Sequence, residues 1–330
     1  MRWRTISAVA AAAALTAAGV VAVQNRTPAP APEPEPVDYV ALGDSFSAGP
    51  LVPDARSDPP GCFRSTNNYP AYLAGHLGVR TYRDVTCSGA RARDLQRPQR
   101  MAFGQTAPPQ LDALSADTDL VTVGIGGNDF GLFGSIVGTC GVLRDRDPRG
   151  APCRRSFTRR IDGRPVDTKA RDARRVEQHV ARALRAVAGR APEADVYVVG
   201  YPRLLPERGR CPAVPFADGD YAWGRRVERL LNDSLSTAAE RSGATFVDLY
   251  PASRGHDACA GRRAWLNGSQ TLFGLAAGFH PFQDGMRGIA GAVHASITGE
   301  EAPRNAEAEP PPGSVVRNPQ RGTDQPDARN

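Results

Sequence analysis

Four short polar segments contain the residues whose types suit nucleophilic catalysis. The first holds Ser45 and the last holds His280, while the middle two supply Gly89 and Asn128. A serine hydroxyl attacks a carbonyl carbon only weakly until a neighbouring imidazole takes its proton. The charge that then develops on the carbonyl oxygen is stabilised by fixed N–H donors, which a glycine backbone and an asparagine amide provide. The segments are residues 43–47 (GDSFS), 88–90 (SGA), 126–129 (GGND) and 278–281 (GFHP).

The elements around these segments predict how they are brought together. Each of the first three follows a short apolar run typical of a strand, and the fourth precedes a helix. Strands that alternate with helices favour an α/β fold, a three-layer α/β/α sandwich with a mostly parallel central sheet. Ligands of such sheets bind beyond the carboxyl ends of the strands. We expect strands at 37–42, 81–85, 120–125, 196–200 and 245–249, and helices at 70–77, 111–114, 170–188, 221–242 and 285–297.

With these four segments in this order, the chain resembles the GDSL-type esterases/lipases of the SGNH hydrolase superfamily. It is similar in particular to the secreted, disulfide-bonded lipases of actinobacteria. The resemblance implies that Ser45 is the nucleophile and that His280 acts first as its general base and then as an acid. It also implies an oxyanion hole made by the backbone N–H groups of Ser45 and Gly89 and by the side-chain amide of Asn128.

One position departs from the family pattern. Many members have an aspartate three residues before the histidine, and this chain has Ala277 there. We expect the main-chain carbonyl of Ala277 to accept from His280 Nδ1–H, as in some close relatives, because a neutral carbonyl can still fix the tautomer of the ring. Asp284 and Asp248 are the alternative partners.

Each candidate also has a purely structural interpretation. Ser45 could cap a helix, and Asp44 is expected to be only a turn or capping residue. Gly127 is interpreted as a turn glycine. The remaining histidines, His76, His179, His256 and His294, are expected at the surface or in packing, whereas Phe46, Phe130, Phe133 and Phe279 could line an acyl pocket or belong to the core.

The sequence therefore predicts a secreted serine esterase or lipase that hydrolyses carboxylic esters, lipid acyl esters above all, through an acyl-Ser45 intermediate. Two alternatives remain: a deacetylase of polysaccharide or envelope material, and an inactive wall-associated binding module. A slot lined by Phe and Leu would favour acyl chains, and a shallow groove would favour the deacetylase. No cofactor is expected, and the partner is a small-molecule or lipid ester.

The six cysteines bear on compartment and stability. An even number in an exported chain favours disulfides. Six cysteines allow 15 connectivities, and we expect sequential pairing because each bond then closes one loop-rich segment, including a polar loop at 141–152. The only metal-like spacing joins His256 to Cys259, and a lone HxxC is weak support for a metal site, so none is predicted. The expected pairs are Cys62–Cys87, Cys140–Cys153 and Cys211–Cys259.

The N-terminus has the layout of an export signal. Arg2 and Arg4 precede an uncharged apolar stretch at 6–23, so we expect a signal peptide at 1–26, with an uncleaved membrane anchor as the alternative. The proline-rich residues 27–36 read as an extended linker. The hydrolase domain is expected at 37–298 and a disordered tail at 299–330.

The charge balance restricts the partners. The chain has 41 Lys and Arg against 35 Asp and Glu, a formal net charge of +6. This small surplus does not indicate a nucleic-acid groove. An arginine cluster between Arg154 and Arg164 is interpreted as a solvated loop and helix start, with contact to an anionic membrane or cell-wall surface as the alternative. We expect a monomer.

Overall fold

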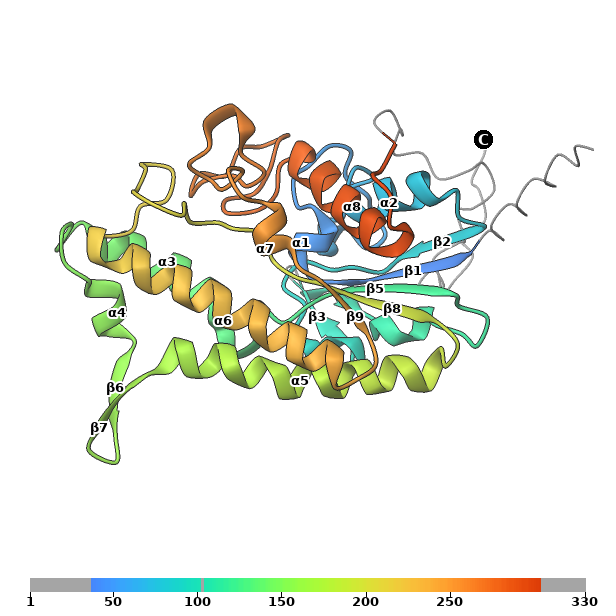
Figure 1. Ribbon diagram of the computed structural model, residues 1–330, viewed down its shortest axis with the longest axis horizontal. Helices are drawn as coiled ribbons and strands as arrows, with labels where there is room; N and C mark the ends of the chain where they lie inside the picture. Colours follow the sequence, from blue (N-terminus) through green and yellow to red (C-terminus); the bar gives the residue numbers. More distant parts are fainter. Residues whose placement is uncertain (1–36, 102–103, 304–330) are drawn as a thin grey trace, which may run out of the picture. The chain divides into compact units, whose positions relative to one another are not determined.

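The computed structural model describes residues 37–101 and 104–303, and the predicted signal, linker and most of the predicted tail lie outside them. Five parallel strands form the central sheet, in the order β2-β1-β5-β8-β9 (Figure 1). β5 is apolar apart from Thr122 and is buried along its whole length, as expected for a strand covered on both faces. The strands are β1 (Asp38–Gly43), β2 (Thr81–Asp84), β5 (Leu120–Gly124), β8 (Asp195–Val199) and β9 (Thr245–Val247).

Helices cover both faces of the sheet, because successive side chains of each strand point to opposite sides. In β1, Val40 and Leu42 belong to the core that faces α5 and α6, whereas Tyr39 and Ala41 belong to the core that faces α2 and α8. The predicted three-layer α/β/α fold is confirmed. The covering helices are α5 (Thr168–Arg190) and α6 (Tyr221–Glu240) on one face, and α2 (Tyr69–Leu77) and α8 (Gln283–Thr298) on the other.

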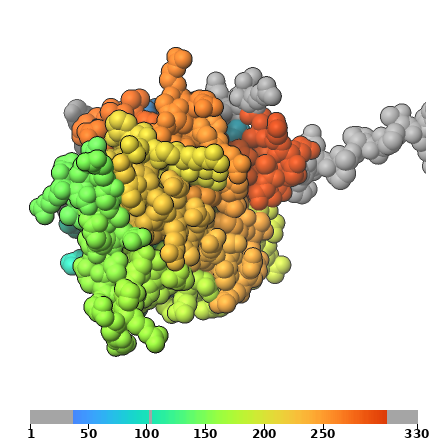
Figure 2. All heavy atoms as spheres, turned by 60° about the vertical axis from the view of Figure 1, so that its left-hand side comes forward, coloured from blue at the N-terminus to red at the C-terminus, as the bar shows by residue number. Residues whose placement is uncertain are grey.

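A third apolar cluster lies beside α6, around the Cys140–Cys153 disulfide. Figure 2 shows the green segments that contain α3 (Leu132–Arg144), α4 (Pro152–Ser156) and the hairpin β6–β7 on one face of the molecule. The prediction of a polar loop at 141–152 is partly wrong, because α3 continues four residues past Cys140. The arginines of the 154–164 cluster lie on α4 and on the hairpin of β6 (Thr158–Ile161) and β7 (Arg164–Asp167).

The remaining elements are short and lie in the connections. None of the helices in the described part of the chain is both long and apolar enough to cross a membrane. The short elements are α1 (Ser45–Ala48), α7 (Leu249–Ala252), β3 (Gln99–Arg100), β4 (Thr106–Ala107), η1 (Pro60–Cys62), η2 (Ala92–Leu95), η4 (Gln110–Ala113), η5 (Asp129–Gly131), η6 (Asp218–Asp220) and η7 (Gly261–Arg263).

Candidate active site

The site lies where the strand order reverses, between β1 and β5. From β1 the chain passes to β2 on one side and later to β5 on the other, so the carboxyl ends of β1 and β5 form a topological switch point. Gly43 and Gly124, the last residues of the two strands, are register partners. The backbone N–H of Asp44 then donates to the Gly124 carbonyl at 2.8 Å. This pairing places the loops after both strands side by side.

Ser45 begins the short helix α1 directly after β1. Asp44 caps this helix, because its Oδ1 accepts from the Phe46 N–H at 2.9 Å. The Ser45 side chain is nearly buried, and its Oγ lies 2.8 Å from His280 Nε2. The structure thus joins two residues that are 235 positions apart in the sequence. This distance is within hydrogen-bond range for proton transfer from the hydroxyl to the imidazole.

The other ring nitrogen of His280 identifies the tautomer. Nδ1 lies 2.7 Å from the carbonyl oxygen of Gly278. A carbonyl oxygen only accepts, so Nδ1 carries the proton and Nε2 is left free to accept from Ser45.

The expectation that Ala277 orients His280 is wrong, because the neighbouring carbonyl of Gly278 does so. The Ala277 oxygen accepts instead from the backbone N–H of His280 at 3.2 Å and from the Asn267 amide at 3.2 Å. Phe279 adopts a left-handed conformation with φ of 62°. The chain reverses at that residue, and the imidazole reaches back two positions rather than three.

Neither alternative carboxylate contacts the imidazole. Asp284 is exposed and pairs with Arg287 at 3.1 Å. Asp248 caps α7 by accepting from the Tyr250 N–H at 3.0 Å. Among the residues that the structure describes, Nδ1 therefore has a neutral main-chain partner.

Aromatic packing sets the electrostatics of His280. The Phe46 and Phe133 rings lie 5.2 Å and 5.8 Å from the imidazole centroid. Burial disfavours the charged ring and lowers the pKa of His280 below its usual 6.5, and the hydrogen bond to Gly278 only partly opposes this. A neutral imidazole is the form that accepts a proton.

The two backbone donors expected in the oxyanion hole have no acceptor within the described chain. These are the N–H groups of Ser45, at the start of α1, and of Gly89. Gly89 is exposed and has φ of 80°, a conformation that glycine adopts without a Cβ clash. Both donors are free to bind an incoming oxygen.

Asn128 joins the loops that follow three strands. Its Nδ2 donates to the Ala90 carbonyl at 3.1 Å and lies 3.5 Å from Asp44 Oδ2. The second contact is at the long limit of a hydrogen bond, so this hydrogen is only weakly engaged. Asn128 is partly exposed and remains able to donate to a bound oxygen.

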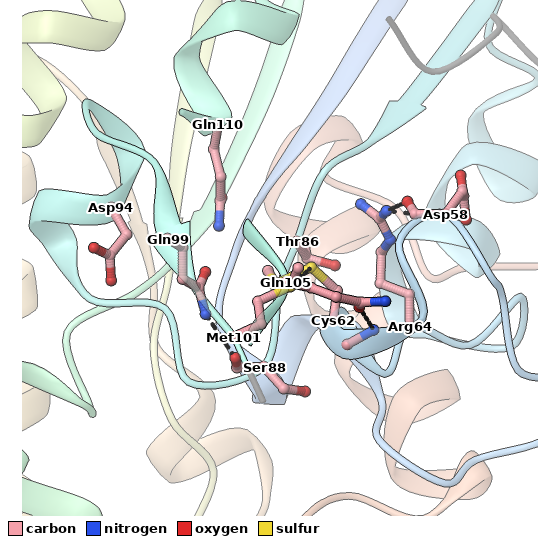
Figure 3. The surroundings of a disulfide bond; sticks show 12 residues. Asp58, Cys62, Arg64, Thr86, Ser88, Asp94, Gln99, Met101, Gln105 and Gln110 are labelled. Carbon is pink, nitrogen blue, oxygen red and sulfur yellow. Dashed lines mark hydrogen bonds and ion pairs between the residues drawn. A yellow bond between two sulfur atoms is a disulfide. The ribbon is translucent and has the colours of Figure 1, made fainter. Parts of the chain in front are cut away.

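A disulfide holds the loop that carries Gly89 (Figure 3). Cys87, two residues earlier, is bonded to Cys62, and the Ser88 N–H donates to the Cys62 carbonyl at 3.0 Å. The Gln99 amide donates to the Ser88 carbonyl at 2.8 Å. These contacts fix the backbone on the N-terminal side of Gly89. The other two bonds are also those of the sequential pairing, Cys140–Cys153 and Cys211–Cys259.

Sequence reasoning missed a buried network under the nucleophile. The Tyr201 hydroxyl donates to Asp44 Oδ2 at 2.6 Å and accepts from the Gly127 N–H at 2.8 Å. Burial raises the pKa of Asp44 to about 7, although its bonds from Tyr201 and Phe46 oppose the rise. Asp44 was expected only to cap a helix or form a turn. It does cap α1, but it also accepts a hydrogen bond from Tyr201. Tyr201 follows β8 by two residues, so the rule that sites lie at strand ends was a signal that could have found it.

An apolar slot opens beside Ser45. The space inside it, counted together with the open solvent at its mouth, is about 770 Å³. Phe46 and Phe133 line it, whereas Phe279 packs in the core. Phe130 lies outside the slot, with its ring centroid 4.7 Å from that of His179. The aliphatic lining comes from α3, α6 and the segment after β8: Leu132, Ile136, Val137, Leu204, Leu205, Val227 and Leu231.

Besides Asp44 and Tyr201, the wall of this slot contains the ionisable side chain of Glu228. Glu228 Oε1 accepts from the N–H groups of Leu204 at 3.3 Å and Leu205 at 3.1 Å, whereas its buried Oε2 has no partner among the described residues. Burial raises the pKa of Glu228 to about 8, and the two backbone bonds oppose the rise. The carboxyl is therefore neutral at pH 7.

The described residues contain no group of three or more His, Cys, Asp or Glu suited to a metal ion. Cys259 is bonded to Cys211, so its sulfur is not a thiolate ligand for the HxxC pair. His256 stacks on Trp265, and His179 binds Asp129 at 2.8 Å.

Comparison with known proteins gives one consistent result. The sequence model of the GDSL-like lipase/acylhydrolase family matches residues 41–287. Lipase 2 of Streptomyces coelicolor is 39% identical over 264 residues, which cover 77% of this chain and 83% of that protein. Two crystal structures are similar, an extracellular lipase of Streptomyces rimosus and phospholipase A1 of Streptomyces albidoflavus. The S. rimosus lipase has a TM-score of 0.64 and is 29% identical, and the match covers 78% of this chain and 99% of that protein. The S. albidoflavus phospholipase has a TM-score of 0.63 and is 27% identical, and the match covers 80% of this chain and 99% of that protein.

Proposed function

The chain belongs to the GDSL-like lipase/acylhydrolase family and is a carboxylic ester hydrolase, and we propose that it cleaves acyl esters through a covalent intermediate on Ser45. The observation that carries this proposal is the 2.8 Å contact between Ser45 Oγ and His280 Nε2, together with the Gly278 carbonyl that holds the ring in the accepting tautomer. Family membership alone leaves open which residues act.

The reaction follows from this geometry in two halves. His280 Nε2 takes the hydroxyl proton as Ser45 Oγ forms a bond to the ester carbonyl carbon. The resulting oxyanion accepts hydrogen bonds from the Ser45 and Gly89 N–H groups and from Asn128. The C–O bond to the alcohol then breaks, and the protonated imidazole gives its proton to the leaving oxygen. Water repeats the sequence on the acyl-serine and releases the acid.

The lining of the slot supports an acyl chain as the bound part of the substrate. Phe, Leu, Ile and Val side chains gain free energy only by covering apolar surface. An acetylated sugar would bring several hydroxyl groups, and these apolar side chains could satisfy none of them. The slot therefore favours a lipid acyl ester over the deacetylase alternative. A Ser45 that lines the slot and is hydrogen-bonded to His280 argues against an inactive binding module.

The test combines variants with graded substrates. Ser45→Ala, His280→Ala and the double variant should each lose at least about 1000-fold in kcat on p-nitrophenyl esters. The double variant should lose no more activity than either single variant, because the two residues act as a unit. Unchanged melting temperatures exclude misfolding. Turnover near the wild-type rate in Ser45→Ala would refute the nucleophile, and the fastest hydrolysis of acetate in a C2–C12 series would refute the acyl slot.

We also propose that the loop before His280 touches a lipid surface. Leu272, Phe273 and Leu275 are 39%, 84% and 55% exposed, and they supply three of the six large apolar side chains exposed in the described chain. Asn267 anchors the base of the loop to the Gln270, Ala276 and Ala277 carbonyls. In Figure 2 the orange segment that includes this loop projects from the surface. An apolar tip of this kind is a site for contact with lipid.

Export and a monomeric state complete the proposal. An apolar stretch at 6–23 follows Arg2 and Arg4, three disulfides suit an oxidising compartment, and the related S. rimosus lipase is extracellular. Every proposed catalytic group comes from one chain, which supports a monomer. N-terminal sequencing and the molar mass of protein recovered from the culture medium test both. A mature N-terminus within the first five residues would favour an uncleaved anchor.

A further inference from the structure

A second hollow, strongly basic, adjoins the proposed catalytic site. Arg91, Arg93, Arg97 and Arg182 line it around His179, and we call this set the basic groove. A neighbouring hollow shares three of these arginines and extends to Gly89. Three arginines come from the loop after β2 and one from α5, so the fold gathers their charge from distant parts of the sequence. A solvated arginine face needs no such concave arrangement.

Three of the four arginines that line the groove have no ion-pair partner among the described residues. Arg91, Arg97 and Arg182 are exposed and form no ion pair with any described residue; Arg93 alone pairs, with Asp94 at 3.4 Å. Asp129, which lines the groove, and Asp94, which lines the neighbouring hollow, both accept hydrogen bonds from backbone N–H groups. The groove therefore presents several free guanidinium groups to one small volume.

The acids beneath the groove are turned toward the protein. Asp94 Oδ2 accepts from the Arg91 N–H at 2.9 Å. Asp129 Oδ1 lies 2.8 Å from His179 Nδ1, and its Oδ2 accepts from the Ala92 N–H at 2.9 Å. Both carboxylates are buried and fix the groove's backbone and imidazole. The exposed surface of the groove is therefore formed by the arginines, and the two carboxylates lie buried behind it.

The groove and the apolar slot are lined by consecutive residues of the loop after β5. Asn128 lines the slot together with Ser45, and the next residue, Asp129, lines the groove. The Asn128 amide also binds the Ala90 carbonyl, which stands between Gly89 and the first arginine of the groove. The slot and the groove are thus connected through residues 128 and 129, and the neighbouring hollow that shares three of the arginines reaches the proposed oxyanion donor Gly89.

We propose that the basic groove binds the phosphate of an ester substrate whose acyl chain occupies the slot. The inference rests on the function proposed above and names its substrate class, a phosphate-bearing lipid. Guanidinium groups present paired N–H donors that match the oxygens of a phosphate. Several such groups suit a phosphate better than a singly charged carboxylate, because a phosphate offers more acceptor oxygens and up to two charges.

The test compares two esters that differ only in the phosphate. We would measure kcat/KM on 1,2-dihexanoyl phosphatidate and on 1,2-dihexanoylglycerol, both as monomers below their critical micelle concentrations. The variant is Arg97→Gln/Arg182→Gln. The control, Arg146→Gln/Arg164→Gln, removes the same charge from exposed arginines outside the groove. Exposed ion pairs are individually weak, so we expect the phosphatidate-to-glycerol ratio to fall about tenfold in the groove variant and less than twofold in the control.

Two further arms separate the sources of the effect. Inorganic phosphate should inhibit wild-type hydrolysis of phosphatidate competitively, and less in the groove variant. The difference between the variants should shrink at high salt, because salt screens exposed charges. A loss seen on anionic vesicles but not on monomers would show a surface attraction in place of a headgroup site, and would overturn the proposal.

The remaining outcomes are equally decisive. An unchanged ratio, an equal fall in the control, or a wild type that cleaves the diacylglycerol but not the phosphatidate would each overturn the headgroup site while leaving the catalytic assignment intact. A wild type inactive on both esters, or an active Ser45→Ala protein, would instead refute the proposed function.

Discussion

The Tyr201 hydroxyl lies 2.6 Å from Oδ2 of Asp44, the residue that precedes the proposed nucleophile. The same hydroxyl accepts from the Gly127 N–H, one residue before Asn128. One phenol therefore ties the Ser45 loop to the Asn128 loop. Because both loops supply proposed oxyanion donors, we regard Tyr201 as a positioning residue.

Removing this hydroxyl should slow the chemistry without weakening substrate binding. In Tyr201→Phe we expect kcat to fall on the order of tenfold while KM stays within twofold, since small displacements of preorganised donors are costly in the transition state. Steady-state kinetics on a soluble p-nitrophenyl ester give both constants. A rise in KM with unchanged kcat would show that Tyr201 serves only as part of the slot wall.

The pH dependence of hydrolysis should report His280. Its pKa lies below 6.5, and protonation of Nε2 as the pH falls removes the base that Ser45 needs. We expect kcat/KM to be level near pH 7 and to decline on the acid side with a midpoint below 6.5. A midpoint near 7 would contradict this and would point to Asp44, whose pKa is about 7.

Glu228 should make the fold less stable as the pH rises. Its pKa is raised from 4.5 to about 8, so below pH 4.5 it is neutral in both the folded and the unfolded states and has no effect. Above that pH only the unfolded chain ionises freely, and stability falls until about pH 8. The shift corresponds to at most about 5 kcal/mol.

Glu228→Gln should remove this dependence. We expect urea unfolding to give a smaller loss of the free energy of unfolding between pH 5 and pH 8 in the variant than in the wild type. Asp233→Asn, an exposed change on the same helix, is the matched control. Parallel curves for Glu228→Gln and the wild type would contradict the burial of this carboxyl.

The exposed loop tip should matter for lipid surfaces alone. On an inactive Ser45→Ala background, we expect Phe273→Ser/Leu275→Ser to bind phosphatidylcholine vesicles at least about tenfold more weakly, because each large apolar side chain gains about 1.5–3 kcal/mol on burial. Val142→Ser alters a side chain that is 61% exposed on α3 and should bind normally. Sedimentation with vesicles measures both, and equal binding by all three proteins would argue against the tip.

The sequence by itself determined the fold class, and its resemblance to a known family indicated the proposed reacting groups. Strand-length apolar runs alternate with amphipathic helices, and this periodicity dictates a parallel sheet. Serine, glycine, asparagine and histidine stand at strand ends or before the last helix, which such a sheet brings to one edge. Sequential cysteine pairing was also expected, and the structure has the same three bonds.

Only the tertiary structure decided which groups surround them. The choice of the Gly278 carbonyl over Ala277 depends on the left-handed turn at Phe279, a dihedral angle that residue types do not reveal. Tyr201 lies 157 positions from Asp44, and Arg182 on α5 joins arginines near position 95. Such contacts depend on side-chain directions and packing between distant elements, whereas sequence patterns report only the local period of each element.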